Sequence, residues 1–303
     1  MAEGAQAEGE AASARRSDDG YFPRGRSMLR RVHGERAVGR LYGQRSLLLQ
    51  ATHPLAFAGL TANTRGYDAP FQRLVHTAQT MEVVFFGSRQ DADRETARVR
   101  ELHSRVRGEI SEPAGRWPAG SRYAADDPQF LLWILACLAD SAQAVYEHLV
   151  RELTAAERER FWHDYLTAGE LFGLPHDAAP PTYADFRGYM DAMLASDDLH
   201  VLPEAQTIAR QVAFELPLPA WRRWALPGIN LLVIGLLPER VRKLYGLGWS
   251  PAHDAAFAAA ARGIRGARPL LPRRLVRGRT GAEYAMVARV ERNRLQRERS
   301  HAG

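Results

Sequence analysis

The histidine at position 103 lies in a context where its imidazole could bind a metal ion. It sits within residues 99–108, a segment with the pattern of a helix. On a period of 3.6 residues, His103 shares a face with Val99, Val106 and Ile110. An imidazole on such an apolar stripe is either a structural histidine bonded to a backbone carbonyl or a ligand held in a dry pocket. Spacing alone favours the structural role.

A second set of polar side chains shares one face of a predicted helix over residues 70–86. Arg73, His76 and Thr77 are three and four residues apart, which places them side by side on a helix. The rest of this segment is largely apolar, and threonine is a poor choice for an exposed helix interior. The stripe is either a solvated face or the lining of a cavity, and its apolar surroundings favour a cavity.

A third polar island is formed by Thr52 and His53 ahead of Pro54. Proline is favoured in the first turn of a helix, so Thr52 is expected to cap a helix that begins at Pro54. His53 is then either a structural residue at the helix boundary or a further ligand.

Three His-Asp pairs suggest a different chemistry, that of a metal-dependent phosphohydrolase. They occupy positions 163–164, 176–177 and 253–254. Such a site needs several ligands that converge on one metal ion. The pairs lie at unrelated helix ends and loops without a shared spacing, so we rank this interpretation last.

Helical patterns dominate the elements that must position these residues. We predict an all-α fold, a single bundle of roughly ten helices, because no alternating stretch typical of a strand is present. Residues 112–127 are rich in proline and glycine and are expected to form a loop. The predicted helices and their signals are Pro70 to Phe86 with Gly87 as the stop, a helix capped by Ser88 or Asp91 that ends at Gly108, one from Asp127 to about Glu152, one from the capping box Thr154–Glu157 to Gly173, and one from Thr182 to about Ser196.

Length and composition allow one large domain with a sizeable core. The chain has 303 residues, of which 46% are hydrophobic. Residues 1–20 are expected to be disordered, residues 21–276 to form the domain, and residues 277–303 to form an exposed basic helical tail. The single cysteine, Cys137, excludes an intrachain disulfide and a site of several cysteines, and it is compatible with a cytoplasmic location.

The charge pattern argues against nucleic acid as a partner. The formal net charge is +6, but the arginines are scattered rather than gathered on one face with aromatic residues. No secretory leader is evident. Residues 224–237 form the longest strongly apolar run, which is too short to span a bilayer. They are either a buried core helix or a segment that docks on a membrane surface.

Four segments together resemble the catalytic domain of the MpaB-like and rubber oxygenase (latex-clearing protein) family. The similarity extends from about residue 35 to residue 272, and residues 237–247 resemble a later helix of the family. The order and spacing of the segments carry the resemblance. They are residues 43–54 (GQRSLLLQATHP), Arg73 to Thr77, residues 83–87 (VVFFG) with 99–108, and residues 123–141, which include YAADDP and Trp133.

The resemblance implies an oxygenase that holds haem b between helices and cleaves or oxidises an unsaturated, isoprenoid-like chain with dioxygen. By position, His103 corresponds to the proximal iron ligand, and Arg73 and Thr77 correspond to the helix that lines the haem pocket. His76 joins these two as a catalytic candidate, and His53 is a further haem-binding candidate. An arginine fork suits a haem propionate. The partners would be an apolar small molecule and dioxygen, with a membrane surface as a further contact.

The chain departs from the family pattern at two positions. Leu135 stands where relatives carry a histidine in the long helix, and His76 stands where the rubber oxygenases carry a lysine. No counterpart of the family's proposed glutamate base is evident. The alternative is therefore a helical protein of the same descent that binds haem or lipid without turnover.

Overall fold

The computed structural model describes residues 20–62 and 70–302, and these form the predicted all-α fold. The expected disorder of residues 1–20 falls, apart from Gly20, outside the described residues. The helices are α2 (Met28–His33), α3 (Arg36–Gln50), α4 (Pro54–Ala62), α5 (Pro70–Phe86), α6 (Arg89–Arg105), α7 (Pro128–Leu149), α8 (Ala155–Leu171), α9 (Tyr183–Ala195), α10 (Pro203–Phe214), α11 (Leu226–Gly235), α12 (Glu239–Leu244), α13 (Pro251–Ala267), α14 (Arg273–Val276) and α15 (Gly281–Ala302), with short 3-10 turns η1 (His176–Ala178), η2 (Ala220–Ala225) and η3 (Arg268–Leu270).

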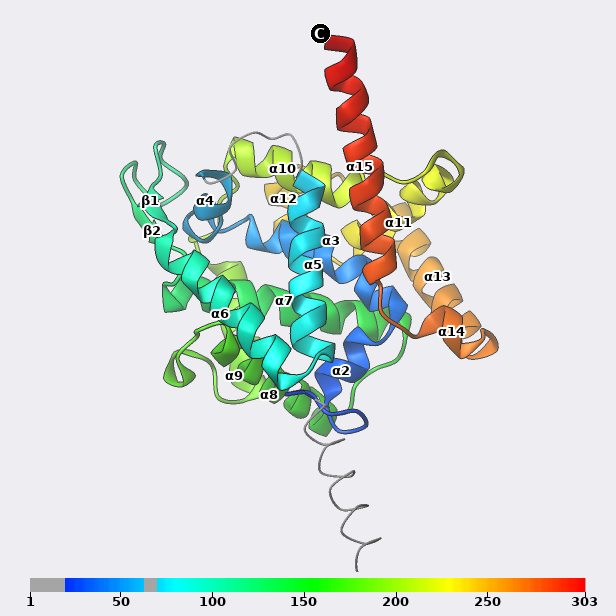
Figure 1. Cartoon of the computed structure of the whole chain (residues 1–303). Helices are drawn as coiled ribbons and strands as arrows, with labels where there is room; N and C mark the ends of the chain where they lie inside the picture. The colour runs from blue at the N-terminus through cyan, green and yellow to red at the C-terminus, as the bar shows by residue number, and fades with distance from the viewer. Residues whose placement is uncertain (1–19, 63–69, 303) are drawn as a thin grey trace, which may run out of the picture.

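Helix α7 is the centre of the core, and α3 packs along it (Figure 1). Its residues are apolar on most sides, and Trp133 and Cys137 are fully buried. A helix that is hydrophobic all round must be surrounded by protein or lipid. Within the described residues, α7 is the one helix long and apolar enough to cross a membrane, and 72% of its apolar window is buried inside the fold.

The predicted helix starts are confirmed by their caps. The Asp127 carboxylate accepts the backbone N–H of Gln129 at 2.9 Å, which starts α7. Thr154 and Glu157 form the predicted capping box of α8, in which each side chain accepts the other residue's backbone N–H. These local interactions satisfy donors that a helix leaves unpaired at its first turn, so the sequence could predict them.

The end of α6 differs from the prediction. The helix stops at Arg105, and residues Arg107–Glu109 form strand β1, which pairs antiparallel with β2 (Arg122–Ala124). Gly108 lies opposite Tyr123, and a Cβ there would stand 2.6 Å from the Tyr123 hydroxyl oxygen. The glycine therefore permits close packing and is not a left-handed helix stop, and Val106 and Ile110 lie beyond the helix that carries His103.

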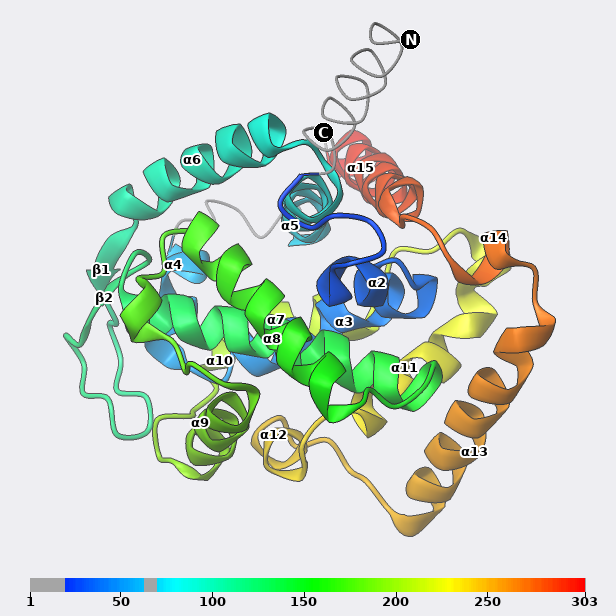
Figure 2. The same cartoon turned by 90° about the horizontal axis from the view of Figure 1, so that it is seen from below.

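Helices α5 and α6 leave a common turn at Gly87 and Ser88 and separate toward their far ends (Figures 1 and 2). We call them the two arms. The far end of α6 runs into the β1–β2 hairpin, which contacts α4, whereas the first turn of α5 lies beside α15. The arms thus present their far-end residues to different neighbours.

Within the predicted tail of residues 277–303, residues 281–302 form helix α15, but the expectation that this helix is exposed is wrong for its first half. Val287 and Ala288 are buried against α5. The Oε1 atom of Glu291 accepts the backbone N–H of Phe71 at 3.1 Å, so α15 caps the first turn of α5. The division of the chain at residue 276 stays a prediction.

Candidate functional site

His103 lies on the inward stripe of α6, in line with Ala92 and Thr96, which are buried. Its Nδ1 atom is buried and has no hydrogen-bond partner among the described residues. Burial lowers the pKa of His103, and the nearby Asp126 carboxylate opposes this only in part. The imidazole is therefore neutral at pH 7, the form that binds metals.

His53 is buried, whereas His103 is partly buried, and His53 has a structural task. Its Nδ1 accepts the backbone N–H of Ala56 at 3.3 Å, so His53 caps α4 where Thr52 was expected to do so. The Thr52 hydroxyl instead donates to the carbonyl oxygen of Leu49. Burial lowers the pKa of His53 to about 4. These contacts support the structural interpretation of His53.

A second buried histidine, His33, was not singled out from the sequence. Its Nε2 lies 2.7 Å from the hydroxyl oxygen of Tyr165, and its ring packs against Tyr42 and Phe85. Burial lowers the pKa of His33 to about 3. Helix α2 has only six residues. That is too short for a periodic pattern to reveal a buried face, and no sequence signal pointed to this residue.

These three histidines differ in how their ring nitrogens are used. A ring nitrogen of His33 is bonded to the Tyr165 hydroxyl group, and a ring nitrogen of His53 accepts the backbone N–H of Ala56. His103 keeps a buried nitrogen without one among residues 20–62 and 70–302. Buried polar atoms are rarely left unpaired unless a ligand, water or ion completes them. Of the three, His103 therefore fits an iron ligand best.

The polar stripe of α5 lies at the surface, whereas the sequence favoured the lining of a cavity. Arg73, His76 and Thr77 are all exposed. Desolvation by neighbouring residues lowers the pKa of Arg73, and the Nε2 of His76 lies 3.4 Å from the Arg98 guanidinium. Apolar residues of α5 face the other way, into the core, which leaves this stripe on the solvated side.

Among the described residues, no hydrogen bond reaches His103 Nδ1 from these three residues. The bonds between the arms lie nearer the turn, where Thr80 donates to Glu95 at 2.6 Å and His76 meets Arg98. His103 is further along α6, where the arms have separated (Figure 2). The polar stripe thus lies on the α5 arm and His103 lies on the α6 arm. Their shared role in a haem site stays a prediction.

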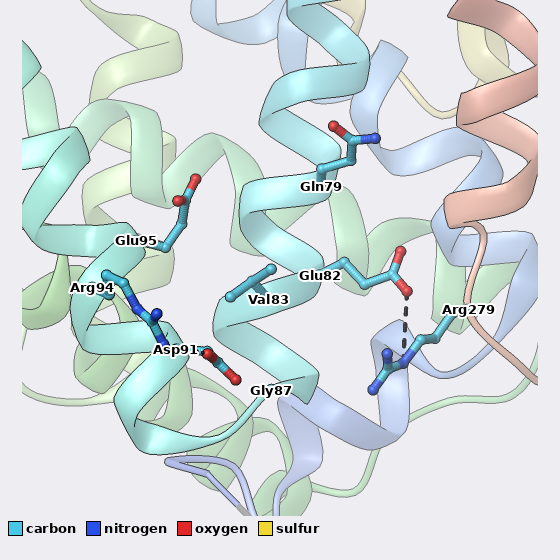
Figure 3. Close-up of a pocket in the computed structure, with 8 residues that line it drawn as sticks. All are labelled: Gln79, Glu82, Val83, Gly87, Asp91, Arg94, Glu95 and Arg279. Carbon is cyan, nitrogen blue, oxygen red and sulfur yellow. Dashed lines mark hydrogen bonds and ion pairs between the residues drawn. The ribbon is translucent and has the colours of Figure 1, made fainter.

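A cavity of about 510 Å³ lies at the turn between the arms (Figure 3). Its side chains are mainly charged, and they pair with one another: Glu82 lies 3.6 Å from Arg279, and Asp91 lies 2.7 Å from Arg94. Its lining residues include no histidine. A haem needs apolar walls and an imidazole, so this cavity does not suit it.

A buried charge network lies in the core, between segments quoted above for the family resemblance. The Arg45 guanidinium reaches Asp140 at 2.7 Å and also donates to the Ser141 hydroxyl and the Leu236 carbonyl oxygen. Burial would raise the pKa of Asp140, but Arg45 and Arg187 outweigh it and hold the pKa below its usual value. These residues join α3 to α7.

Leu135, the position singled out as a departure from the expected family pattern, is part of the core. The side chain is buried, and a Cβ added at Gly169 of α8 would stand 2.7 Å from its Cδ2 atom. An apolar residue is suited to this contact between α7 and α8.

The His-Asp pairs do not form a metal centre. Among the described residues, no group of three or more histidine, cysteine, aspartate or glutamate side chains could hold a metal ion. His253 is part of the capping box of α13, and His176 pairs with Glu170 at 2.6 Å. The phosphohydrolase interpretation has no structural support.

Comparison with known proteins gives a family. The family described as "ER-bound oxygenase mpaB/B'/Rubber oxygenase, catalytic domain" matches residues 30–266. Two uncharacterized proteins, one of Mycobacterium tuberculosis and one of Mycobacterium bovis, are each 29% identical over 210 residues, which cover 69% of this chain and 78% of the relative. No solved structure matches the chain. The chain therefore belongs to the family of the mpaB and rubber oxygenase catalytic domains.

Proposed function

We propose that this protein is a haem b-dependent oxygenase that uses dioxygen to cleave or oxidise an unsaturated, apolar, isoprenoid-like substrate. Membership of an oxygenase family supports the reaction class. The observation that carries the haem assignment is the buried Nδ1 of His103, which lacks a partner among the described residues although its ring is neutral. A single neutral imidazole is a common haem ligand.

In this proposal His103 holds the iron, and the haem when bound supplies the means to activate dioxygen. The Arg73 guanidinium is suited to pair with a propionate carboxylate because its fork can make two parallel hydrogen bonds. His76 and Thr77 supply further polar groups on the α5 arm, where they can hydrogen-bond to a propionate. His53 is withdrawn from the set of proposed ligands because its Nδ1 already caps α4.

The proposal is tested by the absorbance of the purified protein. We expect an intense Soret band in the wild type and its loss, by about tenfold or more in bound haem, in His103→Gly. Added imidazole should restore the band in this variant if the cavity left by the side chain admits it. His163→Gly, a change of an exposed histidine on α8, is the matched control and should keep the wild-type band.

Two results would overturn the assignment. A folded protein that stays colourless after incubation with haem would exclude haem dependence. An unchanged Soret band in His103→Gly would exclude His103 as the ligand and return attention to His76. Circular dichroism of each variant separates loss of haem from loss of fold.

A second candidate function is binding of haem or lipid without turnover. The exposure of Arg73, His76 and Thr77 favours it, because catalytic polar groups normally face a water-excluded pocket. Uptake of dioxygen in the presence of unsaturated isoprenoids distinguishes the two functions. The cytoplasmic location stays a prediction.

A further inference from the structure

Two tryptophans of the 3-10 turn η2 stand out from the surface. Trp221 is 68% exposed and Trp224 is 81% exposed. Tryptophan is usually among the most buried side chains, and it leaves large apolar area in contact with water when exposed. Trp117, Trp133 and Trp162 each donate their indole N–H to a backbone carbonyl oxygen of the fold. The η2 pair therefore serves no evident packing role.

The geometry of η2 sorts its residues into two faces. Side chains three residues apart lie one above the other in a 3-10 helix. Ala220, Arg223 and Leu226 share one face and line a cavity of about 980 Å³. Trp221 and Trp224 share the neighbouring face, so both rings project from the same side of the turn.

Positive charge surrounds this pair. The Arg222 guanidinium lies 4.4 Å from the centre of the Trp221 ring, and Arg223 is the next residue toward Trp224. Helix α15 adds Arg294 and Arg297 at the other wall of the cavity. Glu215 is the single acid among the residues that line this cavity. The local charge thus favours a negatively charged partner.

The cavity beside the tryptophans is mainly apolar. Its walls include Leu216, Leu218 and Leu226 from the segment around η2 and Val290 from α15. Leu216, Leu218 and Leu226 also pack in the small core that contains Phe71 and Val75 of α5. An apolar hollow next to exposed indoles and arginines is suited to the boundary between lipid chains and acidic headgroups.

We propose that η2 docks this protein onto a membrane surface that carries anionic lipids, with Trp221 and Trp224 inserted at the level of the headgroups. Indoles favour this depth because the ring is apolar while its N–H is polar. Arg222 and Arg223 would lie at the phosphate level, where a basic residue is attracted to acidic lipid. This inference does not depend on haem binding or on turnover.

The test is co-sedimentation of the full chain with vesicles. We expect binding to phosphatidylcholine vesicles that contain phosphatidylglycerol and a loss of affinity of about tenfold or more in the double variant W221A/W224A, because the transfer of two indoles is lost. Brominated lipid should quench wild-type tryptophan emission, and the quenched fraction should vanish in the double variant. R222Q/R223Q should lower binding to the acidic vesicles several-fold and reduce its dependence on salt.

Leu102→Ser is the matched control. Leu102 is 54% exposed, and it lies on α6, across the molecule from α11 and α13 (Figure 1). Its substitution should leave vesicle binding unchanged, and the urea midpoint of each variant shows that it is folded. Equal binding of the wild type and W221A/W224A would overturn the proposal. So would equal affinity for vesicles of pure phosphatidylcholine, or an equal loss in Leu102→Ser.

Discussion

The α3–α7 core and the two arms use polar residues in opposite ways. In the core, the buried groups Arg45 and Asp140 are completed by each other and by nearby hydrogen bonds. On the arms, His103 keeps a nitrogen without a partner among the described residues, and Arg73 faces outward. Polar groups of the core thus hold helices together, whereas the α6 arm keeps one histidine nitrogen without a partner among the described residues.

The difference in pairing between core and arms predicts that substitutions in the two regions have different consequences. A buried pair is strongly destabilised when one member is removed, because the other charge is left without compensation. An exposed residue contributes little to stability, so its type is open to selection for another task. Substitutions in the core should therefore act on unfolding, and substitutions on the arms should act on ligand binding.

The largest effect is expected from Arg45→Met. The change leaves Asp140 with Arg187 as its remaining ion-pair partner, and this arginine is partly exposed. We expect the free energy of unfolding to fall by about 3 to 5 kcal/mol. Urea unfolding followed by circular dichroism measures it. In Arg105→Gln, which removes an exposed pair with Glu101, the loss should stay below about 0.5 kcal/mol. Similar losses in both variants would abolish the contrast between core and arm.

The next effect concerns acid stability and His33. Its pKa is about 3 in the folded chain and 6.5 when exposed. As the pH falls below 6.5, the unfolded chain binds a proton that the folded chain does not bind until about pH 3, so stability decreases over this window. In His33→Phe, the decrease in the free energy of unfolding over this window should be about 2 to 4 kcal/mol smaller than in the wild type.

The measurement is a series of urea midpoints across that pH window. His163→Phe changes an exposed histidine of α8 and is the control. Its profile should keep the wild-type slope. A slope that is unchanged in His33→Phe would show that this imidazole is not the group that makes the core sensitive to acid.

The smallest effect is expected where α15 supports the α5 arm. Glu291→Ala removes the acceptor for the backbone N–H of Phe71 and should cost about 1 to 2 kcal/mol. Hydrogen exchange in the first turn of α5 should become faster, whereas α7 should keep its protection. Glu291→Gln retains an oxygen acceptor and should exchange as the wild type does. Faster exchange throughout the chain would mean that the arm is not an independent unit.

Much of the fold was predictable because helix ends depend on nearby residues. Asp127, Thr154 and Thr182 each cap the predicted helix through a bond to a backbone N–H two or three residues ahead. The prediction was wrong at Gly108, because its role depends on Tyr123 across a hairpin. A strand pair of three residues per strand is too short to show alternation, so only the pairing itself reveals it.

The candidate site was predictable in part. Residue type and spacing drew attention to His103, but the same reasoning selected His53, whose Nδ1 bond to the backbone N–H of Ala56 favours a structural role. It also placed Arg73, His76 and Thr77 in a cavity, whereas the structure exposes them. Spacing on one helix shows which residues share a face. It does not show which neighbour that face meets.

The sequence by itself determined the helical class of this protein, most of its helix boundaries and its family, because caps, periodicity and motif order are local properties of the chain. Only the tertiary structure decided that Arg45 meets Asp140, that α15 caps α5, and that His103 keeps a buried ring nitrogen without a partner among the described residues. Each of these depends on which distant segments come together, and burial and pairing follow from that arrangement.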